Sequence, residues 1–122
     1  MALTGDANKI LESGISLNSV GIENWALSRP QALAAIEDLK SLKLTVLGGD
    51  VIQFVQDTPQ LTYDNWFCEI EDNESNIAFA KRSLIVAKSF ISGYRNADVP
   101  EPFFALVLGL DRMHLPDSEA GN

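Results

Sequence analysis

The 122-residue sequence carries 17 acidic and 9 basic side chains, for a net charge of −8. At this length we expect one domain, residues 1–122, with a core of its own. So negative a chain repels a phosphate backbone, which disfavours nucleic-acid binding, and it attracts basic partners instead. A single cysteine excludes an internal disulfide, and neither a membrane span nor a signal peptide is expected, so we predict a cytoplasmic protein.

The first half of the chain predicts a short helix over residues 6–14 and a strand over residues 22–27. The clearest helix start comes next. Ser28 is placed to be the N-cap, Pro30 lies in the first turn, and Gln31 occupies the reciprocal position of a capping box. Apolar residues then recur at helical spacing: Ala32, Ala35, Ile36, Leu39 and Leu42.

The second half predicts an antiparallel hairpin, with strands over residues 44–55 and 61–70 joined by a five-residue turn. The longest helix follows Ser75 and carries an apolar stripe that ends at Tyr94. A last strand is expected over residues 103–108, and from about residue 111 the sequence becomes a polar tail.

After the first helix the predicted order is strand, helix, strand, strand, helix, strand. This order indicates an α+β fold of the ferredoxin-like (split βαβ) plan. In that plan a four-stranded antiparallel sheet carries two helices on one face, here with an additional short N-terminal helix. The last strand would lie at an edge of this sheet, yet residues 103–108 are apolar on both faces. We therefore expect either the N-terminal helix or a second subunit, in a homodimer, to cover its second face.

The segment Gly48-Gly49-Asp50 interrupts the first hairpin strand. Asp50 has the same parity as Val46 and Ile52, which would direct its carboxylate into the core at a high cost. Two solutions are open: a bulge at the glycines re-aims the chain, or a buried Asp50 accepts hydrogen bonds. Either solution gives an architectural role to Gly48, Gly49 and Asp50, and to the partner strand's Asn65 and Trp66.

The second hairpin strand has two possible inner faces. Trp66, Cys68 and Ile70 share one parity, whereas Leu61, Tyr63 and Phe67 share the other. Only one set can face the helices, so the other leaves aromatic side chains on the open face of the sheet, beside acidic residues. Such a surface is suited to binding a protein, and a dimer contact or the N-terminal helix would cover it equally well.

Catalytic, metal and cofactor signals are weak. His114, the only histidine, lies in the polar tail, and Cys68 has no histidine near it in the sequence, so we expect no catalytic residue. Asp50, Asp64 and Glu69 could bind a divalent cation in principle, but their spacing matches no cation loop. We therefore predict no metal site and no cofactor. The Gly-Gly-Asp triplet also lacks the remainder of the diguanylate cyclase signature, because Val51 and Ile52 follow it.

Several short motifs together resemble a bacterial family, immunity protein 40 of polymorphic-toxin systems, between about Gly14 and Leu108. The motifs are Asn24-Trp25-Ala26-Leu27 with Gln31-Ala32-Leu33, Leu47-Gly48-Gly49-Asp50-Val51, Tyr63-Asp64-Asn65-Trp66-Phe67, Asn73-Glu74-Ser75 and Arg82-Ser83. Two positions depart from the family pattern: Phe67 replaces an expected tyrosine, and Ile52 replaces an expected aromatic residue.

The resemblance implies a protein that is not an enzyme and that binds a cognate toxin domain to occlude it. Because many such toxins are nucleases with basic channels, an acidic inhibitor could mimic the charge of the substrate. The candidate contacts are Tyr63, Asp64, Glu69, Glu71 and Asp72, although the motif residues are equally consistent with a role in the fold. The alternative is a small-molecule-binding or catalytic domain with a pocket near Asp50, between the sheet and the long helix.

Overall fold

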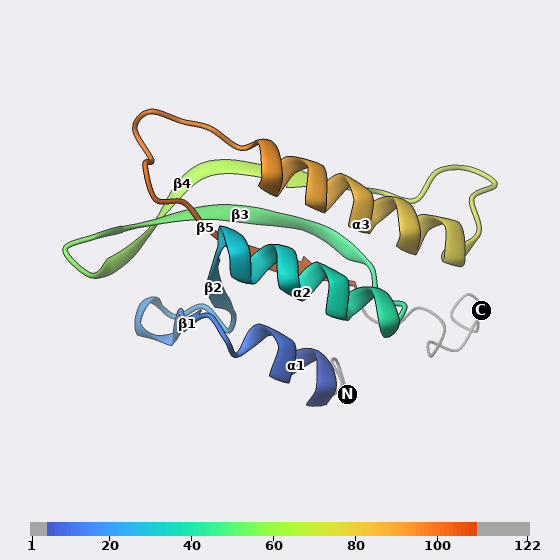
Figure 1. Ribbon diagram of the computed structural model, residues 1–122, viewed down its shortest axis with the longest axis horizontal. Helices are drawn as coiled ribbons and strands as arrows, with labels where there is room; N and C mark the ends of the chain where they lie inside the picture. The colour runs from blue at the N-terminus through green and yellow to red at the C-terminus, as the bar shows by residue number, and fades with distance from the viewer. Residues whose placement is uncertain (1–4, 110–122) are drawn as a thin grey trace.

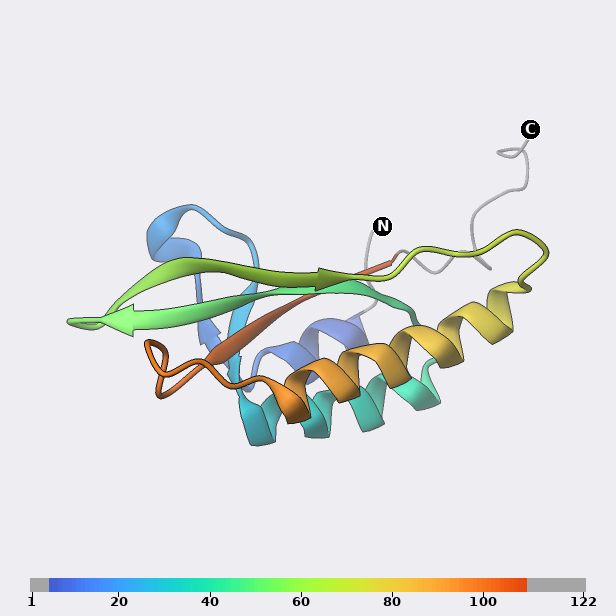
Figure 2. The ribbon, with the colours of Figure 1, turned by 90° about the horizontal axis from the view of Figure 1, so that it is seen from above.

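The computed structural model describes residues 5–109, and this part of the chain forms an α+β fold with three helices packed on one face of an antiparallel sheet (Figures 1 and 2). The helices are α1 (Gly5–Leu11), α2 (Arg29–Ser41) and α3 (Asn76–Gly93), and a 3-10 turn spans Asn18–Val20. The strands are β1 (Ile15–Ser16), β2 (Trp25–Ser28), β3 (Val46–Val55), β4 (Thr58–Phe67) and β5 (Phe103–Leu108). The predicted polar tail and His114 lie outside the described residues.

The sheet confirms the predicted α+β class but differs from the predicted four-stranded, ferredoxin-like arrangement. It has five strands in the order β1-β2-β5-β3-β4, because the two-residue strand β1 pairs with β2. The last strand, β5, lies between β2 and β3 rather than at an edge. This central position explains why β5 is apolar on both faces. Phe104 and Leu106 enter the core beneath the helices, and Ala105 belongs to a second cluster on the opposite face.

That second cluster is covered by the segment that follows α1. Leu17 is fully buried against Ala26, Ile52 and Ala105, and Ile22 packs beside it. In Figure 2 this segment rises on the side of the sheet opposite the helices. Helix α1 itself lies on the helical side, with Leu11 in the main core. The expectation of an N-terminal helix on the second face is therefore wrong, because the loop after that helix supplies the cover.

The two long helices begin as their sequences predict. Ser28 Oγ accepts a hydrogen bond from the Gln31 amide, and Gln31 Oε1 accepts one from the Ser28 amide, which completes the capping box. Gln31 also donates to the Ser13 carbonyl and so ties α2 to the end of the first loop. At the start of α3, Ser75 Oγ accepts a hydrogen bond from the Ala78 amide.

The β3–β4 turn is tighter than the predicted five residues. Only Gln56 and Asp57 connect the strands, and both have positive φ angles, 51° and 66°. Two consecutive residues with positive φ match the twist of an antiparallel hairpin. Residues 58–60 therefore belong to β4, which ends at Phe67, three residues earlier than predicted.

A bulge in β3 decides which face each of its side chains occupies. Val46 pairs with Leu108 of β5, but Gly48 pairs with Val107. Strand β3 therefore advances by two residues where β5 advances by one, and Leu47 is the additional residue. Val46 and Val51 consequently share the core beneath the helices, whereas Ile52 belongs to the cluster on the other face. The prediction that Val46 and Ile52 share a face is wrong, and of the two solutions weighed for Asp50, the structure contains the bulge.

Candidate functional site

The face of the sheet opposite the helices carries nine residues in a regular array, which we call the open-face patch. The pairing registers of β5, β3 and β4 align three rows: Val107, Gly48 and Phe67; Ala105, Asp50 and Asn65; and Phe103, Ile52 and Leu61. The loop around Leu17 covers Ala105, Phe103 and Ile52. The remaining apolar residues are exposed: the solvent-accessible fraction of the surface is 72% for Phe67, 44% for Val107 and 41% for Leu61.

Asp50 lies at the centre of this array, with Gly48 in the next row and Ala105 beside it. Its carboxylate has no hydrogen bond or ion pair with any other side chain or backbone group among residues 5–109, and it is half-buried. Because Asp50 faces away from α3, it cannot line a pocket between the sheet and that helix. The pocket predicted as the alternative is therefore not formed around Asp50, and the bulge in β3 is the reason.

Strand β4 contains a larger irregularity, which displaces Tyr63 from the sheet. Asp50 pairs with Asn65, but Ile52 pairs with Leu61, so three residues of β4 oppose Val51 alone. Thr62 Oγ1 donates to the Val51 carbonyl at 3.0 Å and accepts from the Asp64 amide at 3.1 Å, which replaces part of the backbone ladder. Tyr63 has a φ of 71°, an uncommon value for a bulky residue, and its side chain is 82% exposed.

Asp64, next in the chain, connects β4 to the end of α3. Its Oδ2 accepts hydrogen bonds from the Tyr94 hydroxyl at 2.6 Å and from Asn96 Nδ2 at 3.2 Å. These donors, Tyr94 foremost, lower the pKa of the Asp64 carboxyl below its ordinary value. Burial and the bond to Asp64 raise the pKa of the Tyr94 hydroxyl. Asp64 is thus engaged within the fold and lies on the helical side of the sheet, away from Phe67.

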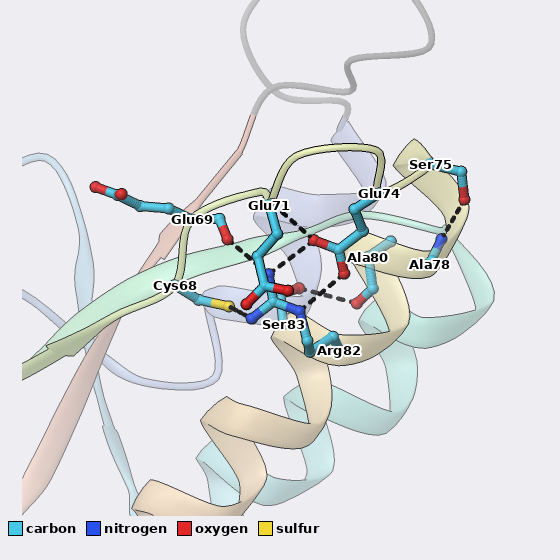
Figure 3. A network of polar contacts seen from close by, with 9 residues as sticks. All are labelled: Cys68, Glu69, Glu71, Glu74, Ser75, Ala78, Ala80, Arg82 and Ser83. Atoms are coloured by element: carbon cyan, nitrogen blue, oxygen red, sulfur yellow. Dashed lines mark hydrogen bonds and ion pairs between the residues drawn. The ribbon is translucent and has the colours of Figure 1, made fainter.

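The loop between β4 and α3 is organised by Arg82, as Figure 3 shows. Arg82 Nε and Nη2 each donate to the Glu74 carboxylate at 2.8 Å, Nη2 also donates to the Glu69 carbonyl, and Nη1 reaches Cys68 Sγ at 3.3 Å. Glu74 in turn accepts a bond from the Glu71 amide at 2.9 Å. The bonds from Arg82 lower the pKa of Glu74 to about 2, and the same pairing raises the pKa of Arg82.

This loop carries three exposed acidic side chains on an ordered backbone: Glu69, Glu71 and Asp72. The structure therefore places the five predicted contacts in two groups. Tyr63 and Asp64 lie in the β4 bulge, whereas the other three lie in the loop beyond the end of β4. The sequence analysis included Phe67 in one of the two sets that could form the open face, but it selected neither Phe67 nor Val107 as a contact. The usable signal was the alternation of Phe67 with the buried Trp66, which puts the two rings on opposite faces.

Basic side chains are distributed unequally between the helices and the strands. Every lysine and arginine among residues 5–109 lies in a helix or within two residues of a helix end. The strands and the other loops contain only acidic charges: Glu23, Asp50, Asp57, Asp64, Glu69, Glu71, Asp72, Asp98 and Glu101. The strands β3, β4 and β5, which carry the open-face patch, thus contain no basic side chain.

Residues of the short sequence motifs hold the fold together. A Cβ on Gly48 would come within 2.3 Å of the Trp66 carbonyl oxygen, and one on Gly49 within 2.3 Å of the Trp66 ring. Asn24 Nδ2 donates to the Leu106 carbonyl at 2.9 Å, and the buried Ser83 Oγ accepts from the Val46 amide at 3.0 Å. These contacts give the motifs a structural basis that is separate from the exposed patch.

Among the described residues, no helix is both long and apolar enough to cross a membrane, and no group of histidine, cysteine and acidic residues could hold a metal ion. No curated protein and no solved structure matches the chain. A family model does match it, and the match to Immunity protein 40 covers residues 16–108, which include β2 through β5 with α2 and α3. The chain therefore belongs to the Immunity protein 40 family.

Proposed function

We propose that this immunity protein neutralises a cognate toxin domain by binding it and covering its functional surface, without catalysing a reaction. Membership of the Immunity protein 40 family supports this role. The encounter would take place in the cytoplasm of the cell that makes both proteins. The toxin is proposed to be a basic protein, such as a nuclease, because the chain carries a net charge of −8.

The observation that carries the proposal is that the strands bearing the open-face patch contain acidic side chains and no basic ones. The open-face patch combines exposed apolar side chains with an acidic surround and, within the described chain, has no basic side chain to repel a basic partner. Exposed aromatic residues within a polar rim are typical of protein-binding surfaces. We therefore place the toxin on this side, with Phe67 and Tyr63 in contact and Glu69, Glu71 and Asp72 as the acidic rim.

Asp64 has a different role in this proposal. Because its carboxylate is bound by Tyr94 and Asn96, it fixes the bulge that presents Tyr63. A direct salt bridge from Asp64 to the toxin would compete with these two bonds. We therefore propose that Asp64 positions the surface rather than contacting the partner.

The test is to co-express the protein with the toxin encoded by the neighbouring gene and to purify any complex. Recovery of growth together with a stable stoichiometric complex supports the proposal. Growth arrest that persists although both proteins are soluble would refute it. Enzymatic turnover of the toxin in place of a stable complex would also contradict occlusion.

The acidic rim is tested separately through the association rate. The double variant Glu71→Lys and Asp72→Lys should slow association strongly at low salt and less at high salt, because long-range attraction is screened by salt. The matched control reverses Glu37 and Asp38, two exposed acids of α2, which changes the net charge equally on the helical side. Equal slowing in both variants would remove the loop from the interface.

A further inference from the structure

Three groups of the open-face patch meet around one point. Asp50 and Asn65 are directly paired across β3 and β4, and Phe67 is the next residue of β4 on the same face. Directly opposed residues have Cβ atoms about 5 Å apart, and diagonal neighbours are about 7–8 Å apart. A carboxylate, an amide and an exposed aromatic ring therefore occupy neighbouring positions on one face of β3 and β4.

The hydrogen bonds of this group leave acceptors available. Asn65 Nδ2 donates to the Tyr63 carbonyl at 3.2 Å, which orients the amide and leaves Oδ1 as its free acceptor. The Asp50 carboxylate has no partner among residues 5–109. Two acceptor groups thus stand beside an exposed ring on β3 and β4, and neither strand contains a lysine or an arginine.

We propose that Asp50, Asn65 and Phe67 form a receptor for an arginine side chain of the toxin. This inference rests on the proposed function and names the chemistry of the contact. A guanidinium group is planar, so one face can stack on the Phe67 ring while its forked N–H donors reach the Asp50 and Asn65 oxygens. Lysine matches this arrangement less well, because its ammonium is a compact and strongly hydrated charge without a planar face.

A second copy of this chain is a poorer occupant of the patch. In a two-fold interface through this face, each copy would present the same surface to the other, and the strands β3, β4 and β5 that form it contain acidic but no basic side chains. Juxtaposed like charges oppose such a contact. Charge complementarity therefore favours a basic partner of a different sequence over a homodimer formed through this face.

The first test measures the affinity for the neighbouring toxin domain. Asp50→Asn and Phe67→Ala should each weaken binding by about thirtyfold, the loss typical of a residue at the centre of an interface. Their matched controls are Asp38→Asn on α2 and Ile85→Ala on α3, both exposed on the helical side, which should leave the affinity unchanged. Thermal unfolding of each variant checks that the fold is retained.

The second test does not need the toxin. A short peptide with one arginine is titrated into the isotope-labelled protein, and the same peptide with citrulline, which keeps the shape without the charge, is the control. The arginine peptide should shift the NMR signals of Gly48, Asp50 and Phe67, and Asp50→Asn should abolish the shifts. If the two peptides cause the same NMR shifts, or if neither causes any, the proposal of an arginine receptor is wrong.

The outcomes separate this inference from the proposed function. If the toxin binds and both Asp50→Asn and Phe67→Ala keep the full affinity, the arginine receptor is wrong and the immunity role stands. If no complex with the toxin forms, the immunity role fails, and the peptide titration still decides whether the patch binds arginine.

Discussion

The indole ring of Trp66 on β4 lies over Gly49 on β3, so closely that a Cβ at residue 49 would be 2.3 Å from Trp66 Cη2. The two residues are direct cross-strand partners, and the other side of the indole stacks on Phe90 of α3 with ring centroids 4.6 Å apart. The glycine thus allows a large aromatic ring to lie between the sheet and the helix. This contact links two of the motifs that characterise the sequence.

Substitution of Gly49 by alanine should therefore destabilise the protein by about 1–3 kcal/mol, the usual cost of overpacking a core. Gly48→Ala should be at least as costly, because its Cβ would approach backbone atoms of β4, which cannot rotate away. Urea denaturation measures both effects. Gly93→Ala is the control: a Cβ there meets nothing within 4 Å, and alanine is the better helix former. A loss at Gly93 as large as at Gly49 would contradict the packing argument.

The Arg82–Glu74 pair predicts a specific loss of stability in acid. The pKa of Glu74 is about 2 in the folded protein, whereas the ordinary pKa of a glutamate side chain, which applies to the unfolded chain, is 4.5. A depressed pKa contributes stability above the unfolded value, and that contribution disappears as the pH falls from about 4.5 towards 2. Glu74→Gln should therefore be less stable than the parent at neutral pH and should approach it in acid.

Unfolding curves collected between pH 7 and pH 2 measure this difference. The control is Ser89→Ala on α3, which removes an exposed hydroxyl and no titratable group. The difference between the parent and Ser89→Ala should stay constant with pH. A constant difference for Glu74→Gln as well would show that the ion pair does not act as described.

Removal of the Tyr94 hydroxyl should raise the pKa of Asp64 towards its ordinary value. The hydroxyl is the foremost cause of the lowered pKa, and Asn96 alone would remain in Tyr94→Phe. The side-chain carboxyl signal of Asp64, followed by NMR through a pH titration, gives the pKa directly. Tyr63→Phe, which removes the hydroxyl of an exposed tyrosine from the same bulge, should leave it unchanged. If Asp64 has the same pKa in both variants as in the parent protein, the hydrogen bond from Tyr94 does not lower the pKa of Asp64.

Ser83 is fully buried, and its hydroxyl joins α3 to β3. It accepts from the Val46 amide and donates to the Ala80 carbonyl at 2.9 Å. Ser83→Ala leaves the buried Val46 amide without a partner, which should cost about 1–3 kcal/mol in chemical denaturation. The exposed Ser89→Ala on the same helix should be neutral or slightly stabilising. Equal effects at the two positions would mean that the buried bond contributes nothing.

Helices were predicted well from the sequence where the prediction depended on residues that are close together in the chain. The capping box at Ser28 and the stripe of α3 depend on residues a few positions apart, and both are found in the structure. Strand order depends on contacts between distant segments, and this is where the prediction was wrong. The two apolar faces of β5 indicated a buried strand, yet the ferredoxin-like plan assigned it to an edge.

The faces of the hairpin show a second limit of sequence reasoning. Strict alternation put Asp50 in the core, but the bulge at Leu47 and Gly48 reverses the parity of every later residue in β3. The glycines made a bulge one of two possibilities, and only the register with β5 decides between them. The residues of the open-face patch could not be predicted from the sequence for the same reason, because they depend on the pairing registers of β3 with both β4 and β5.

The most direct test of the account is calorimetric titration of this protein into the purified toxin domain of the neighbouring gene, with toxin activity assayed at each point. The account predicts a one-to-one complex and a residual activity that falls in proportion to the uncomplexed toxin. It also predicts that Asp50→Asn weakens the complex while Asp38→Asn does not. Absence of heat and full toxin activity at excess protein would contradict it.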